Sequence, residues 1–159
     1  MADVFELRVN DDNHVMSPAE LADALAWADV LCPTVTDSLT DELLSAPTVN
    51  ARLLANFGVG FNHIDMAAAF RVGIAVTNTP GVLTDATAEI ALTLMLISAR
   101  RAGEGERLVR SGQWHGWHHT HMLSTQVTGK TLGIVGMGRI GLALAKQAHY
   151  GLGMSIVYS

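Results

Sequence analysis

The sequence holds a single cysteine, Cys32, among 159 residues. One thiol cannot form an internal disulfide, and it cannot supply the several ligands of a thiolate zinc site. Cys32 lies in a short apolar run, residues 29–33, that predicts a buried strand. We therefore expect a chemically inert thiol in the core of the protein.

Excess charge and long apolar runs are scarce as well. Charged residues make up 16% of the chain and the net charge is −5, which excludes a nonspecific nucleic-acid binder. No apolar run reaches the length of a membrane span, and residues 1–10 lack the basic and then apolar pattern of a secretory leader. We expect a cytoplasmic protein with neither a nucleic acid nor a membrane as its partner.

The charges that are present divide unevenly along the chain. Residues 1–98 contain 13 acidic and 3 basic side chains, whereas residues 99–159 contain 2 acidic and 7 basic ones. This change in composition predicts two domains with a boundary near residue 98. The second domain is the one suited to an anionic ligand.

Short apolar runs alternate with helical patterns in the first part of the chain, which is typical of an α/β fold with a parallel sheet and crossover helices. Ser17 precedes a helix over residues 18–28, and Asp65 and Gly73 are expected to begin and end another. Thr40 is expected to cap a short helix between them. The expected strands are residues 5–9, 30–32, 52–55 and 74–77.

One long helical pattern runs over residues 84–112, with Thr84 or Asp85 as its expected cap. Its first half, residues 86–99, is apolar on nearly every face but too short to span a membrane. We therefore expect a helix that is buried between layers and passes from one domain to the next.

A loop rich in tryptophan and histidine follows at residues 113–129. Its four histidines have no cysteine or carboxylate nearby, and their spacing fits no helix face, so we expect no metal site. These histidines are His115, His118, His119 and His121. The loop is interpreted as an aromatic surface segment, with Trp114 and Trp117 packed against a neighbouring segment or a second subunit.

The most informative stretch is residues 131–141, where a buried strand runs into a glycine pattern and a helix follows. Gly136 allows a tight turn, Gly138 lets the backbone approach a pyrophosphate, and Gly141 lets helix and strand pack closely. The free amides and the positive end of the helix can then hold phosphates. Arg139 lies in the same turn and can add a positive charge.

Residues 154–158 predict the second strand of a dinucleotide-binding fold. The acidic residue that binds the adenosine ribose should stand at the end of this strand, where the chain has Ser159. Either Ser159 occupies that place, which would favour NADP, or the place lies beyond it, so NAD and NADP both remain open. Such a fold needs more than two strands, and we expect a truncated nucleotide domain.

Five stretches together resemble the D-isomer-specific 2-hydroxyacid dehydrogenases, and most closely the glyoxylate and hydroxypyruvate reductases of that family. They are residues 56–65 (NFGVGFNHID), 78–89 (NTPGVLTDATAE), 100–101 (RR), 111–117 (SGQWHGW) and 129–141 (GKTLGIVGMGRIG). The resemblance implies a flavodoxin-like substrate domain, incomplete over residues 1–98, and the first βαβ unit of a Rossmann domain over residues 99–159. It also implies a homodimer in the intact enzyme.

The resemblance assigns roles to particular residues. The backbone amides of Val59 and Gly60 are expected to hold the carboxylate of a small 2-keto or 2-hydroxy acid, because successive amides in a glycine turn form an anion-binding nest. Thr87 is expected to contact the nicotinamide side of the cofactor. Arg139 and Ile140 are expected to lie along its phosphates, beside the three glycines.

The family's catalytic arginine, glutamate and histidine have no counterpart in this chain, so we expect no catalytic residue here. The resulting hypothesis is an N-terminal fragment of an NAD(P)-dependent dehydrogenase that is inactive alone. One alternative is a non-catalytic nucleotide-binding or interaction module, and another is an incomplete gene model.

Overall fold

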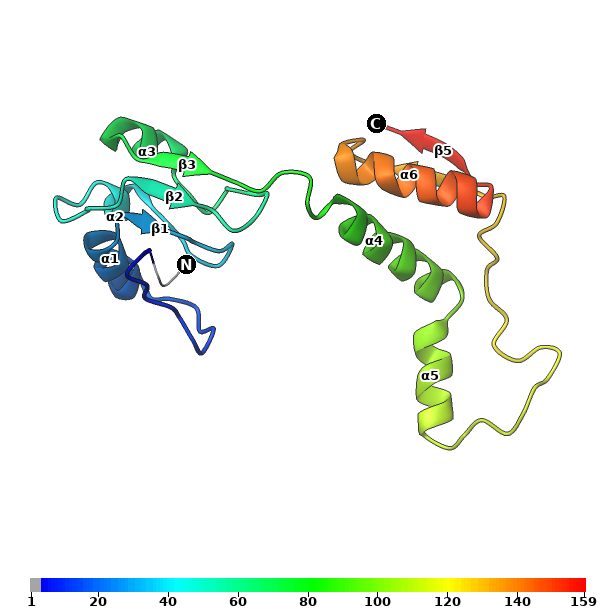
Figure 1. Ribbon diagram of the computed structural model, residues 1–159. Helices are drawn as coiled ribbons and strands as arrows, with labels where there is room; N and C mark the ends of the chain where they lie inside the picture. Colours follow the sequence, from blue (N-terminus) through cyan, green and yellow to red (C-terminus); the bar gives the residue numbers. More distant parts are fainter. Residues whose placement is uncertain (1–3) are drawn as a thin grey trace. The chain divides into compact units, whose positions relative to one another are not determined.

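The computed structural model describes residues 4–159, whose contacts divide the chain after Pro80 into two compact units (Figure 1). The charge pattern predicts a boundary near residue 98. The contacts instead divide the chain after Pro80, which places the whole of the following helix in the second unit. The assignment of residues 1–98 to a substrate domain and of 99–159 to a nucleotide domain stays a prediction. Within the described range, no helix is long and apolar enough to cross a membrane.

The first unit is built on a parallel sheet whose strands follow the order β1-β2-β3. Its strands are β1 (Val30–Leu31), β2 (Leu53–Ala55) and β3 (Ala75–Thr77), and its helices are α1 (Pro18–Trp27), α2 (Asp41–Leu44) and α3 (Met66–Val72). Helices and strands alternate along the chain, which is the connection that parallel strands require. The predicted α/β class with a parallel sheet is confirmed.

The helix ends of this unit follow from local side-chain hydrogen bonds. The hydroxyl of Ser17 accepts from the Glu20 amide at 3.3 Å, and the Glu20 carboxylate accepts from the Ser17 amide at 2.7 Å. Asp65 accepts from the Ala68 amide at 2.9 Å at the start of α3, and Gly73 ends that helix with φ +80°. Each of these ends was predicted from the residue types, and each is confirmed.

The core of the first unit gathers aliphatic side chains from its helices and its central strand. Leu25 of α1 and Leu54 of β2 have no exposed surface. The buried cluster consists of Leu21, Leu25, Leu39, Leu44, Ala51, Leu54, Ile64, Ala68, Ala69 and Ile74. Burial of this apolar surface is the main force that holds the helices to the sheet.

Two predictions about the free side of this sheet are wrong. Residues 5–9 form no strand, and Phe5 and Val9 are 61% and 70% exposed. Cys32 is exposed and not buried. Both errors have the same physical reason. Among the described residues β1 pairs only with β2, so no strand pairs with its other edge. An alternating apolar pattern forms a strand only when it has a partner.

The second unit pairs two parallel strands, β4 (Thr131–Ile134) and β5 (Ser155–Tyr158), through the helix α6 (Arg139–Leu152). This is the predicted βαβ unit. The helix α4 (Thr84–Ala99) packs along α6, as Figure 1 shows, and α5 (Ala102–Arg110) follows it. The small core centres on Val127, Ala148 and Met154, with Met95 and Leu96 of α4 packed against it.

The predicted single helix over residues 84–112 is broken at Arg100 and Arg101. Arg101 has φ +55°, a left-handed conformation that interrupts the helical hydrogen bonds between α4 and α5. Its guanidinium bonds to the Glu104 carboxylate at 2.6 Å and to the carbonyl of Leu123 at 2.9 Å. These contacts with residues outside α4 stabilise the break, and helical periodicity alone cannot indicate them.

The expectations for the start and the burial of this helix are also corrected. The N-cap of α4 is Leu83, which makes no side-chain capping bond, so neither Thr84 nor Asp85 caps the helix. Only Ala88 of α4 is fully buried, whereas Ile90 and Leu94 are 60% and 59% exposed. One face of α4 packs on α6, and its opposite apolar face is uncovered in this chain.

Candidate functional site

The glycine turn between β4 and α6 has the geometry that the sequence predicts. Gly136 has φ +96°, a conformation that favours glycine. A Cβ on Gly141 would lie 2.4 Å from the carbonyl oxygen of Gly136, so only glycine lets the helix approach the turn this closely. A Cβ on Gly136 or Gly138 would meet nothing within 4 Å, so the space in front of the turn is open.

The start of α6 is suited to a negatively charged group. The N-cap Gly138 makes no side-chain capping bond, and the first turn holds no acidic residue. The first amides of a helix have no partner inside it, so those of Arg139 and Ile140 are available to an external acceptor. The Arg139 side chain is exposed at the positive end of the helix dipole, where its charge is unfavourable unless an anion is bound. The turn therefore fits a pyrophosphate.

Ser159 lies directly beside this turn. The amide of Gly136 donates to the carbonyl of Ser159 at 3.0 Å, and the amide of Ser159 donates to the carbonyl of Ile134 at 3.1 Å. The end of β5 and the glycine turn are thus joined at the carboxyl edge of the sheet. This is the edge at which open parallel sheets bind their ligands.

In the first unit, the predicted carboxylate loop follows β2. This carboxylate loop consists of residues 58–60, and each of its three carbonyls accepts a hydrogen bond from a side-chain amide. Asn56 donates to the carbonyls of Gly58 at 3.1 Å and of Gly60 at 2.9 Å. Asn78, which follows β3, donates to the carbonyl of Val59 at 2.9 Å. Within residues 4–159, the amides of Val59 and Gly60 donate to no backbone carbonyl, so they remain available to an anion.

The side chains that hold this loop, Asn56 and Asn78, were not predicted from the sequence. Asn56 is 1% exposed, and its carboxamide oxygen lies 2.9 Å from Nε2 of the half-buried His63. Asn56 and Asn78 each come directly after a strand in the sequence, and this placement is the signal that could have found them. Their contacts nevertheless depend on the loop conformation, which the sequence does not reveal.

Thr87, the predicted nicotinamide contact, belongs to the second unit and is exposed on the first turn of α4. Its hydroxyl donates to the carbonyl of Leu83 at 2.8 Å. The same carbonyl already accepts from the Thr87 amide at 3.0 Å, so the hydroxyl makes a second bond to it and keeps its oxygen lone pairs accessible. The role of Thr87 toward a cofactor stays a prediction.

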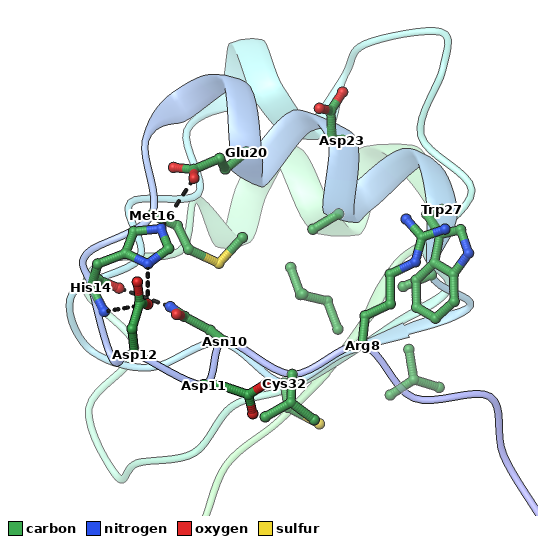
Figure 2. Close-up of a pocket in the computed structure, with 15 residues that line it drawn as sticks. Arg8, Asn10, Asp11, Asp12, His14, Met16, Glu20, Asp23, Trp27 and Cys32 are labelled. Atoms are coloured by element: carbon green, nitrogen blue, oxygen red, sulfur yellow. Dashed lines mark hydrogen bonds and ion pairs between the residues drawn. The ribbon is translucent and has the colours of Figure 1, made fainter. Parts of the chain in front are cut away.

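A cavity of the first unit lies elsewhere, with a volume of about 660 Å³ between residues 8–16, α1 and β1 (Figure 2). Figure 2 shows His14 between two carboxylates, with Nδ1 2.5 Å from Asp12 and Nε2 3.1 Å from Glu20. Hydrogen bonds to Asp12 and then to Glu20 raise the pKa of His14. Across the cavity, the Arg8 guanidinium lies 4.0 Å from the centre of the Trp27 ring. No residue predicted to bind substrate or cofactor lines this cavity.

The loop over residues 113–129 forms no helix or strand. Trp114 and Trp117 are 54% and 74% exposed, and the Trp117 ring meets His119 edge to face with centroids 4.8 Å apart. Throughout the part of the chain that the structure describes, no three His, Cys, Asp or Glu side chains are grouped as metal ligands. The packing of both tryptophans on a second subunit stays a prediction.

The sequence and the fold of this chain have counterparts in known proteins. Residues 1–155 match the family model "D-isomer specific 2-hydroxyacid dehydrogenase, catalytic domain". The chain belongs to this family of 2-hydroxyacid dehydrogenases.

Among individual relatives, the chain is 45% identical over 159 residues to a glyoxylate reductase of Thermococcus litoralis, an alignment that covers 97% of this chain and 47% of that protein. A crystal structure of a D-isomer specific, NAD-binding 2-hydroxyacid dehydrogenase from Polaromonas sp. is similar with a TM-score of 0.89 and 45% identity. The superposition covers 99% of this chain and 49% of that protein. The chain spans about half the length of the curated relatives it matches.

A third relative has been solved with ligands. The D-lactate dehydrogenase of Aquifex aeolicus, complexed with NAD and lactic acid, is similar with a TM-score of 0.74 and 27% identity. The alignment covers 87% of this chain and 45% of that one.

Proposed function

We propose that this chain supplies the carboxylate loop and the pyrophosphate turn of an NAD(P)-dependent 2-hydroxyacid dehydrogenase that reduces a small 2-keto acid of the glyoxylate or hydroxypyruvate type. The observation that carries the proposal is the carboxylate loop, whose carbonyls accept from Asn56 and Asn78, while the amides of Val59 and Gly60 donate to no backbone carbonyl of residues 4–159. A small keto acid is recognised mainly by its carboxylate, and two adjacent amides fit that group.

The loop is suited to substrate binding because it holds an anion without a charged side chain. A carboxylate that accepts hydrogen bonds from Val59 and Gly60 is fixed in direction, which leaves its keto group free to face a reacting partner. The Thermococcus litoralis relative, a glyoxylate reductase, supports a substrate of this size. The exact keto acid depends on contacts outside this loop.

The residues of the second glycine turn fit a nicotinamide dinucleotide. Gly136, Gly138 and Gly141 shape the turn, and the amides of Arg139 and Ile140 would donate hydrogen bonds to the pyrophosphate oxygens. Thr87 would contact the nicotinamide side. When bound, the nicotinamide ring supplies the hydride that reduces the keto carbon. If Ser159 occupies the place of the ribose-binding acidic residue, NADP is favoured over NAD; if that place is the next residue, both cofactors remain open.

Proton donation is the step for which this chain offers no residue. The family resemblance implies that the catalytic arginine, glutamate and histidine have no counterpart among residues 1–159, and that none of the seven histidines here is the proton donor. We therefore propose that the 159-residue chain alone binds ligands without turnover. Reduction of glyoxylate with NADPH by the pure chain would overturn this part of the proposal.

The intact enzyme is proposed to be a homodimer. The exposed Trp114 and Trp117, together with the uncovered apolar face of α4 at Ile90 and Leu94, offer apolar surface for an interface. Location in the cytoplasm stays a prediction.

A cofactor titration tests the proposal. NADH and NADPH are added separately to the full 159-residue chain while tryptophan and nicotinamide fluorescence are recorded. The variant Gly138→Val should fold, because its side chain meets open space, but should bind at least about tenfold more weakly because the valine fills the pyrophosphate position.

The variant Gly151→Ala, in α6 and away from the glycine turn, is the control and should bind like the unaltered chain. Absence of binding at millimolar cofactor would contradict the proposal and leave the alternative of an interaction module. Equal binding by Gly138→Val would also contradict it.

A further inference from the structure

The carboxylate loop is held from beneath by a side chain that the fold places in the interior. Asn56 is 1% exposed and directly follows β2. Its backbone is fixed on one side by the bond from its amide to the carbonyl of Thr77 at 3.0 Å. On the other side, the amide of Phe57 donates to the carbonyl of Pro33 at 2.8 Å. The carboxamide of Asn56 therefore starts from a rigid position.

The two donor bonds of Asn56 help to set where the loop amides point. A trans peptide is planar, so its N–H points opposite to its C=O. The carbonyl of Gly58 shares a peptide plane with the amide of Val59. Asn56 holds that carbonyl inward at 3.1 Å, together with the Thr79 amide, which donates to it at 3.0 Å. The Val59 amide is consequently turned outward. Asn56 also holds the carbonyl of Gly60, and through that plane it turns the amide of Phe61.

His63 in turn decides which end of the Asn56 carboxamide faces the loop. Its Nε2 lies 2.9 Å from the carboxamide oxygen and donates to it, so the NH₂ group is directed at the two carbonyls. The backbone of His63 is itself fixed, because its carbonyl accepts from the Leu39 amide at 2.8 Å. Nε2 can donate whether the imidazole is neutral or charged, so this bond survives protonation.

We infer that Asn56 and His63 are positioning residues for substrate binding: His63 orients the Asn56 carboxamide, and Asn56 orients the Val59 amide toward the carboxylate of the keto acid. This inference rests on the proposed function of the loop. It goes beyond that function by assigning the direction of one anion-binding amide to a buried pair that touches no ligand.

Amide directions measured by NMR residual dipolar couplings test the inference without any ligand. In the full 159-residue chain, Asn56→Ala should reorient the Phe61 amide fully and the Val59 amide in part, because the Gly58 carbonyl keeps its bond from the Thr79 amide. The Gly60 amide should keep its direction, because Asn78 holds the carbonyl of Val59 in that plane. Unchanged couplings at Val59 in the folded variant would show that the Thr79 amide alone sets this plane, and would overturn the inference.

The second arm measures binding of sodium oxamate, an inert analogue of a 2-keto acid, from the amide chemical shifts of Val59 and Gly60. Asn56→Ala should weaken binding about tenfold, roughly the factor expected for loss of one oriented hydrogen bond to an anion. Asn50→Ala is the matched control, since Asn50 also donates to a backbone carbonyl, that of Ala28 at 3.3 Å, but lies away from the loop. It should bind oxamate normally.

A pair of variants at His63 keeps the test decisive if Asn56→Ala does not fold. His63→Leu removes the donor and should weaken oxamate binding, whereas His63→Gln retains an N–H donor and should restore most of it. Equal binding by both would overturn the inference. If the amide directions change as expected but the unaltered chain does not bind oxamate, the proposed function of the loop fails and the positioning role stands.

Discussion

Gly141 approaches Gly136 so closely that a Cβ at Gly141 would lie 2.4 Å from the carbonyl oxygen of Gly136. This oxygen belongs to the backbone and cannot rotate away as a flexible side chain could. We therefore expect Gly141→Ala to lower the free energy of unfolding by about 1–3 kcal/mol, the usual cost of overpacking. Urea denaturation followed by circular dichroism measures it.

Gly151→Ala is the control for this prediction, because it lies in the same helix with no atom within 4 Å of the added Cβ. It should leave the stability unchanged or raise it by up to about 0.5 kcal/mol, since alanine favours helix over glycine. Equal effects of the two substitutions would contradict the close approach at Gly141.

The cap of α3 gives a second prediction. Asp65 accepts from the Ala68 amide at 2.9 Å, so Asp65→Ala should lower the free energy of unfolding by about 1 kcal/mol. Asp65→Ser keeps an acceptor in the same place and should recover most of the loss. Thermal unfolding of the three proteins provides the comparison, and a serine variant as unstable as the alanine variant would argue against capping.

The third prediction concerns pH and His14. Its contacts with Asp12 and Glu20 raise the pKa of His14 above the ordinary 6.5, so their stabilising effect is complete below that value and is lost as pH rises through the raised pKa. The pKa of Asp12 is lowered from 3.8 mainly by its hydrogen bond to His14. The contribution of Asp12 is therefore lost as pH falls through that lowered pKa.

NMR titration of the His14 ring should give a pKa above the ordinary 6.5. In Asp12→Asn the His14 pKa should fall, because the first and largest cause of its increase is removed. All three side chains are exposed, so solvent screens these contacts and the change in global stability should be small. An unaltered His14 titration in Asp12→Asn would refute the assigned cause.

A fourth prediction follows from the exposure of Cys32. The thiol should react with a water-soluble disulfide reagent in the folded protein, at a rate close to that in denaturant. Cys32 is the only cysteine, so the reaction reports on one site. A thiol that reacts only after unfolding would show that the free side of β1 is covered in solution.

The features that could be predicted from the sequence are those that neighbouring residues determine. Ser17 with Glu20 begins α1, and Gly73 ends α3, because capping bonds form within a few residues of the chain. The glycine turn at Gly136 is predicted for the same reason, since a glycine pattern between a strand and a helix has few other conformations.

The features that could not be predicted depend on distant partners. The break at Arg101 rests on a bond to Leu123, which lies 22 positions away along the chain. Cys32 is exposed because β1 lies at the edge of the sheet and no further strand pairs with it among the described residues. No local sequence pattern predicts this. In the candidate site, Val59 and Gly60 were predicted from a resemblance, whereas the contact between Asn56 and His63 appears only once the loop is folded.

Because Arg101 is not a glycine, its left-handed conformation costs about 1 kcal/mol or more, and the bonds to Glu104 and Leu123 offset that cost. The angle between α4 and α5 is thus fixed by the Arg101 side chain. The loop over residues 113–129 follows α5, so its direction depends on this angle. Loss of the Arg101 bonds would reorient the loop and leave the glycine turn at Gly136 unchanged.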